Sequence, residues 1–96
     1  MQVVGVEEFR QNLGFFLYRA GKGQSFLVAR HGRVQALIRP VRDGDRFPRI
    51  GAAALRERAF QVVGNAEEEP LVVTVYDRPA AVVTGAPPRI RPRYGG

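Results

Sequence analysis

The order of apolar and polar positions in the first 40 residues predicts a small unit of one helix and three strands. Apolar side chains at positions 6, 9, 13, 16, 17 and 20 follow the spacing of one helical face. Residues 25–30 and 33–39 are apolar-rich runs on either side of a His-Gly pair, which predicts two strands joined by a tight turn. A short apolar strand over residues 2–4 precedes the helix. We therefore expect the order strand, helix, strand, strand.

The same pattern returns 46 residues further along, and it predicts a second such unit without a gap. A helix is expected over residues 52–66, with strands over 71–76 and 80–84 around an Asp-Arg-Pro turn. Apolar positions stay in register, whereas identities are limited to three pairs: Gly5 and Gly51, Arg10 and Arg56, Ala20 and Ala66.

The predicted fold class is α+β, with two tandem βαββ units in one pseudo-two-fold-symmetric domain. The units share a sheet and pack their helices against it, because about 40 residues cannot bury enough surface alone. The expected boundaries are 1–41 for the first unit, 42–49 for a charged connector, 50–85 for the second unit and 86–96 for a basic Pro/Gly-rich tail.

Two residues carry local expectations. Gly14 is the expected break point of the first helix, because glycine costs about 1 kcal/mol relative to alanine in a helix interior. A break there would re-aim Phe15 and Tyr18, which fall off the apolar stripe. Pro79 suits the first position of an edge-type strand, where no backbone donor is needed.

Charge and composition narrow the class of partner. The 15 basic residues exceed the 9 acidic ones, giving +6, and all but Lys22 are arginine. Arginine grips phosphate and guanine edges with two parallel hydrogen bonds, although a compositional bias of the genome explains an arginine excess equally well. The chain has no cysteine, no apolar run near 18 residues and no signal-peptide pattern. We expect a cytoplasmic protein with no membrane partner.

Residues for catalysis or metal binding are scarce. His31 is the only histidine, in a predicted turn and without an acidic cluster around it. Hydroxyl side chains other than tyrosine are limited to Ser25, Thr74 and Thr84, and no phosphate-binding glycine loop occurs. We expect no enzyme activity, no metal site and no cofactor.

Residues 2–41 carry a recognisable pair of motifs. The helix has an acidic-x-Arg-x-x-Leu motif in Glu8, Arg10 and Leu13. The hairpin has Ala29 followed by three further motif positions: Arg30, Gly32 and Leu37. This segment resembles the Phd/YefM family of bacterial antitoxins, in which threonine is usual at the place of Ala29.

The resemblance implies a function and departs from the family in two respects. Family members dimerise through this region, bind palindromic operator DNA with basic residues near the helix start and the hairpin, and repress their own operon. Their C-terminal extension binds a toxin, whereas residues 42–96 here hold the second unit and a short tail. The second unit also has Ala53 and Ala54 at the acidic positions, with Tyr76 and Arg78 at the hairpin arginine and glycine.

We therefore expect a DNA-binding transcriptional regulator that binds double-stranded DNA, with a cognate toxin as a candidate partner. The expected DNA contacts lie on the helices and hairpins: Arg10, Asn12 and Arg56, then Arg30, Arg33 and Arg78. Ion pairs to Glu7 or Glu57 are the alternative role for the helix arginines, and protection of strand edges is the alternative for the hairpin arginines. Arg89, Arg91 and Arg93 could form a DNA-binding arm.

Other functions remain open at this stage. The main alternative is a protein-binding module, neutralising a toxin or acting as a scaffold, that has lost DNA binding. An AbrB-like swapped-hairpin regulator fits the short strands and basic loops but lacks this helix pattern. Phe15 and Tyr18 have no aromatic counterparts in the second unit, which favours a homodimer over a monomer.

Overall fold

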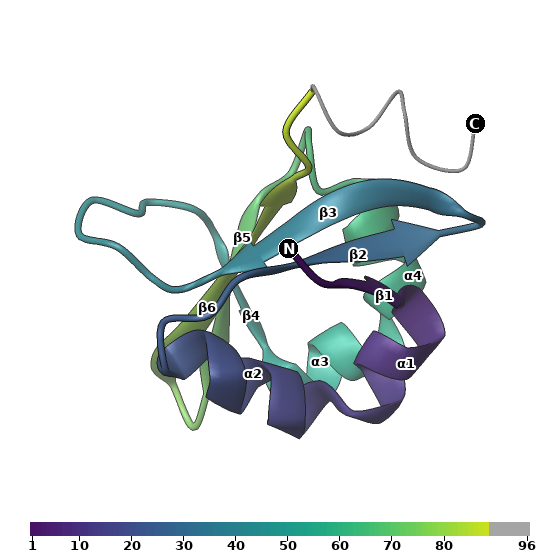
Figure 1. Ribbon diagram of the computed structural model, residues 1–96. Helices are drawn as coiled ribbons and strands as arrows, with labels where there is room; N and C mark the ends of the chain where they lie inside the picture. Colours follow the sequence, from purple (N-terminus) through teal and green to yellow (C-terminus); the bar gives the residue numbers. More distant parts are fainter. Residues whose placement is uncertain (89–96) are drawn as a thin grey trace.

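The protein folds as a small α+β domain in which helices cover one face of a mixed sheet. The computed structural model describes residues 1–88 and has a radius of gyration of 12.0 Å. The four helices lie on one side of the sheet, below it in the view of Figure 1. The elements follow the chain as β1 (Val3–Gly5), α1 (Val6–Gln11), α2 (Leu13–Gly21), β2 (Phe26–Arg30), β3 (Arg33–Arg39), β4 (Arg49–Gly51), α3 (Ala52–Glu57), α4 (Ala59–Gly64), β5 (Leu71–Val75) and β6 (Arg78–Gly85).

The six strands have the spatial order β1-β2-β3-β6-β5-β4. We call residues 3–39 the first half and residues 49–85 the second half. In each half the short first strand pairs in parallel with the second, which pairs antiparallel with the third. The two halves join where β3 and β6 pair antiparallel, from Ala36 opposite Gly85 to Arg39 opposite Val82. The expected single mixed sheet is thus confirmed, and β1 and β4 are its edges.

The main core lies between the sheet and the helices. Its buried side chains come from both halves, and the largest are Phe9, Phe26, Leu13, Ile38 and Leu55. A smaller apolar cluster of Leu27, Val34 and Ala86 lies apart from this core. Helical segments of 6 to 9 residues are too short to be stable alone, so packing on the sheet holds them in place.

Each predicted helix is broken, but Gly14 is not the break point. The breaks fall at Asn12 (φ −117°, ψ 33°) and Arg58 (φ −113°, ψ 20°), and Gly14 lies inside α2. The second half bends at the equivalent place with Phe60 where the first half has Gly14. A glycine is therefore not the cause. In both halves the bend lets two short helices turn their apolar faces to one sheet.

The prediction of a gapless repeat is wrong by one residue in the second hairpin. The starts of β1 and β4, of α1 and α3, and of α2 and α4 are 46 positions apart. The turn residues with positive φ are His31 and Gly32 in one half and Tyr76 and Asp77 in the other, 45 positions apart. The register irregularities, Val28/Ala29 and Val73/Thr74, keep the same offset of 45. Thr74, not Val75, therefore occupies the place of Ala29.

Strand β6 is longer than expected and lies inside the sheet. It begins at Arg78, so Pro79 is its second residue and not the first of an edge strand. Strand β3 pairs only with positions 82–85 of β6, and Pro79 pairs with Thr74 of β5. The missing backbone donor of Pro79 thus falls on a stretch of β6 that β3 does not reach, which is why proline is tolerated there.

The connector between the halves is fixed by a partly buried ion pair. The guanidinium of Arg39 donates to both carboxylate oxygens of Asp45, at 3.1 and 2.8 Å, and also to the carbonyl of Pro40. The backbone N–H of Arg42 donates to the same carboxylate at 2.6 Å. These hydrogen bonds lower the pKa of Asp45 to about 2. The connector is therefore an ordered loop in which the carboxylate stays charged.

Among residues 1–88, no helix combines the length and the apolar composition needed to cross a membrane.

Candidate nucleic-acid interface

Arg10 lies in the last turn of α1 and is engaged by its own helix. Its guanidinium forms a two-point ion pair with the carboxylate of Glu7, to which Gln11 also donates at 3.1 Å. Hydrogen bonds from Arg10 lower the pKa of Glu7, and the same pair raises the pKa of Arg10. The alternative role, pairing with Glu7, is therefore present in this structure. A phosphate would have to displace or share that partner.

Arg56 has the equivalent place on α3 but a different environment. Position 53, which corresponds to Glu7, is alanine. Arg56 is exposed, and within residues 1–88 it makes neither an ion pair nor a side-chain hydrogen bond. Glu57 follows it on the helix but does not pair with it. Arg56 can therefore bind an anion without losing an existing contact.

Asn12 and Arg58 are the residues at the two helix breaks. The amide of Asn12 donates to the carbonyl of Glu8 at 3.1 Å, and so it helps to end α1. Arg58 is exposed at the equivalent break, two residues after Arg56, and the two arginines line different grooves. Sequence reasoning overlooked Arg58, although its offset of 46 from Asn12 was readable in the repeat.

Arg30 faces inward in the first hairpin. Its Nη1 donates to the carbonyl of Phe60 in α4 at 3.0 Å, while its Nε is buried and unpaired within the described part of the chain. The guanidinium lies directly over Gly64, where a Cβ atom would approach within 2.3 Å of Nη1. Arg30 thus joins the first hairpin to the second half. This contact competes with the DNA role expected for it.

Arg33 and Arg78 directly follow the two hairpin turns and are both exposed. Arg33 lines a small cavity of about 190 Å³ together with Gly64, Glu67 and Glu68, so two acidic residues share its cavity. An approaching phosphate at this turn would meet negative charge as well as Arg33.

Arg78 lies in a different setting. It pairs across the strands with Val75, which lines a groove of about 390 Å³ with Tyr18 and Arg56. Cross-strand partners share one face of a sheet, so Arg78 points to the side of this groove. Arg56 and Arg78 therefore belong to one surface, whose other members include an aromatic ring and no acidic lining residue.

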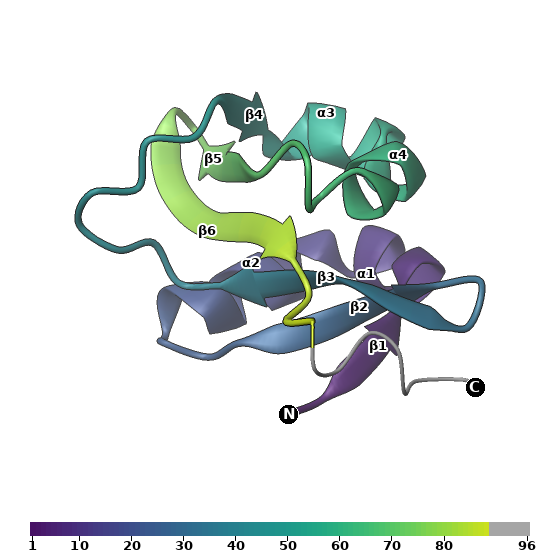
Figure 2. The same ribbon diagram turned by 90° about the horizontal axis from the view of Figure 1, so that it is seen from above.

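The six expected residues do not form one cluster. The two hairpin turns lie at opposite ends of the molecule, as both ribbon views show (Figures 1 and 2). The molecule is 38 Å long along its major axis. Residues Arg89, Arg91 and Arg93 of the expected arm lie outside the described residues.

Two further features bear on binding. Phe15 and Tyr18 are 57% and 64% exposed on α2, next to Arg19 and Lys22, whose charged groups lie 5.5 and 5.3 Å from the ring centroids.

The described chain holds no group of three or more His, Cys, Asp or Glu side chains that could bind a metal ion.

No protein-family model, curated protein or solved structure matches this chain significantly. The likeness to Phd/YefM antitoxins therefore depends on the motifs of residues 2–41 alone.

Proposed function

We propose that this chain is a DNA-binding transcriptional regulator similar to Phd/YefM antitoxins. In this proposal two tandem units are related by a pseudo-two-fold axis that passes between β3 and β6. The repeated element order, the palindromic strand order and the two equivalent left-handed turns support the duplication. The covalent pair would then replace the dimer that family members form.

Recurrence of arginine at equivalent places is the observation that carries the DNA proposal. Arg10 and Arg56 are each the fifth residue of the first short helix, and Arg33 and Arg78 each follow the left-handed turn. Two symmetric sets on a molecule 38 Å long suit a duplex, whose helical turn is about 34 Å. A net charge of +6 favours the same partner.

The two halves are expected to contribute unequally. Arg56 lines one groove, and the exposed Arg78 is the cross-strand partner of Val75 in that groove, whereas Arg10 is paired with Glu7 and Arg33 shares a cavity with Glu67 and Glu68. Binding by the first half must overcome these carboxylates. The arginines of the second half therefore supply the larger share of the affinity.

A titration of DNA from upstream of the gene, at several salt concentrations, tests this proposal. Each phosphate contact that is removed lowers the log–log salt slope by about one. We expect the double variant Arg56→Ala and Arg78→Ala to lower the salt slope by about two. The double variant Arg10→Ala and Arg33→Ala should lower this slope by less. Arg46→Ala in the connector is the matched control and leaves the slope unchanged. If the wild type and the double variant of Arg56 and Arg78 bind DNA equally, this surface is not the DNA-binding site.

A protein-binding module without DNA binding is the second candidate. A groove of about 600 Å³ beside the edge strand β4 favours it. Failure of the wild type to bind any duplex at low salt would make this candidate the leading one. The exposed Phe15 and Tyr18 add a proposed homodimer contact, which light scattering at micromolar concentration tests directly.

A further inference from the structure

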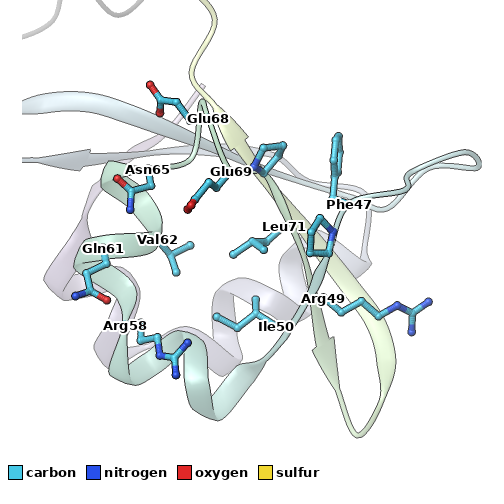
Figure 3. Close-up of a pocket in the computed structure, with 12 residues that line it drawn as sticks. Phe47, Arg49, Ile50, Arg58, Gln61, Val62, Asn65, Glu68, Glu69 and Leu71 are labelled. Atoms are coloured by element: carbon cyan, nitrogen blue, oxygen red, sulfur yellow. The ribbon is translucent and has the colours of Figure 1, made fainter.

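A further groove lies between β4 and α4, and none of the arginines expected to contact DNA lines it. Figure 3 shows its apolar floor, formed by Ile50, Val62 and Leu71, open to the outside of the sheet. Its volume is about 600 Å³. Glu68 and Glu69 stand at one end and Arg58 at the other. The groove is thus apolar in the middle and oppositely charged at its ends.

The first half fills the equivalent space with its own side chains. Phe16 and Phe26 occupy the places of Val62 and Leu71, with ring centroids 4.8 Å apart. Arg19 of α2 closes the opening, where it donates to Gln24 and, at 3.1 Å, to Gln2. An aromatic side chain and a guanidinium therefore complete this region in the first half.

The second half lacks these two components but keeps a partner for one of them. Asn65 stands where Arg19 would be, so no guanidinium arises from the helix. At the place of Gln24 the second half has Glu69, a stronger acceptor for a cation. No basic side chain pairs with Glu69 within residues 1–88. A carboxylate next to an unfilled apolar floor is complementary to a cationic and aromatic occupant.

Strand β4 supplies the backbone of a docking site. The carbonyl of Pro48 accepts a hydrogen bond from Val72 of β5 at 2.8 Å. Because backbone groups alternate in direction along a strand, the N–H and C=O of Arg49 point away from β5, to the free edge. An extended segment can add to such an edge through main-chain hydrogen bonds and place alternate side chains in a neighbouring groove.

From these observations we propose that the groove between β4 and α4 binds an extended peptide of a partner protein, with an aromatic residue and an arginine or lysine two positions apart. The spacing follows because residues two apart on a strand point to the same side. The aromatic ring covers Val62 and Leu71, and the cation pairs with Glu69. This inference goes beyond DNA binding and does not depend on it.

Fluorescence anisotropy with labelled synthetic peptides tests the proposal. The probes are short threonine-rich peptides with arginine and phenylalanine two positions apart, in both orders, and versions with alanine for either residue. We expect Val62→Phe, which copies Phe16, to weaken binding about tenfold or more by filling the floor. Glu69→Gln, which copies Gln24, should weaken the arginine peptides about fivefold and leave the arginine-to-alanine peptide unchanged. Glu57→Gln on α3 is the matched control and changes neither.

Several results would overturn the proposal. Either absence of binding by the wild type or equal binding by the wild type and Glu69→Gln contradicts it. If Val62→Phe fails to fold, as circular dichroism would show, Glu69→Gln still decides the outcome. Sedimentation of the wild type as a dimer that Val62→Phe makes monomeric would identify a second copy of this chain as the occupant instead.

Discussion

The cores of the two halves differ in their content of phenylalanine. Phe9, Phe16 and Phe26 form a buried cluster with centroid distances between 4.8 and 6.0 Å. At the corresponding places the second half has smaller side chains: Leu55, Val62 and Leu71. The backbone elements follow in the same order in both halves. Val62 and Leu71 line the groove beside β4, at the places where the first half has two phenylalanine rings.

The arginines of the two halves also differ in whether they contact other residues of the chain. Arg30 of the first hairpin donates to the carbonyl of Phe60, whereas Val75 at the equivalent place has an apolar side chain that cannot donate a hydrogen bond. Arg10 is paired with Glu7, and Arg56 faces an alanine. These arginines of the first half thus make internal contacts, whereas Arg56 of the second half is exposed.

Substitution of the central core residue in each half should reveal this difference most strongly. Phe16→Ala is expected to lower the free energy of unfolding by about 3–5 kcal/mol, because the ring is buried and its removal leaves a cavity. Val62→Ala removes only two carbon groups beside an open groove, which corresponds to about 1–2 kcal/mol. Urea denaturation followed by circular dichroism measures both. Equal losses would mean that the second half is packed as tightly as the first.

The sequence predicted most of this core but not the strand register of the second hairpin. The helical stripe gave the residues that face the sheet, including Phe9 and Phe16, because a 3.6-residue period identifies one face. The one-residue offset in the second hairpin escaped notice for a physical reason. Strands β2 and β5 are apolar at almost every position and buried on both faces, so a slip of one residue leaves the apolar pattern intact.

The candidate site was predictable only in part. The repeat identified the equivalent arginines Arg10 and Arg56, yet it could not separate an engaged side chain from an available one. The direction of Arg30 depends on the packing of α4 against the first hairpin, where Gly64 leaves room for the guanidinium. That contact joins residues far apart in the chain, and no local spacing encodes it. The groove beside β4 is lined by Val62 and Leu71 at the places of Phe16 and Phe26, and hydrophobic patterning treats these apolar side chains as equal although they differ in size.

Acid should weaken the ion pair between Arg39 and Asp45 that fixes the connector. The pKa of Asp45 is lowered to about 2 in the folded protein, against about 3.9 in an unfolded chain. The contribution of Asp45 to stability is therefore complete above about pH 4 and is lost as the pH falls through about 2. Asp45→Asn should lower the melting temperature at pH 7 and show a smaller further loss between pH 4 and pH 2 than the wild type.

Glu7→Gln is the matched comparison for Asp45→Asn. Its carboxyl pKa is also lowered, so its contribution has the same sign, but its pair with Arg10 is solvated and lies within one half. We expect a smaller effect of pH there, measured by thermal melts from pH 2 to pH 7. A pH dependence of Asp45→Asn identical to that of the wild type would show that the connector does not stabilise the fold.

The smallest expected change in stability concerns one helix position, which is Gly14 in the first half and Phe60 in the second. Gly14 lies within α2, and a Cβ atom there would meet no atom within 4 Å. Gly14→Ala should therefore raise the free energy of unfolding by about 0.5–1 kcal/mol, because alanine restricts the unfolded chain without a clash in the folded one. Gly23→Ala is the matched control, since its φ of +92° places it in the left-handed region, and that change should cost about 1–2 kcal/mol. Opposite signs in urea midpoints are expected. Destabilisation by both would show that Gly14 is required by a partner or a second copy packed against α2, beside the exposed Phe15 and Tyr18.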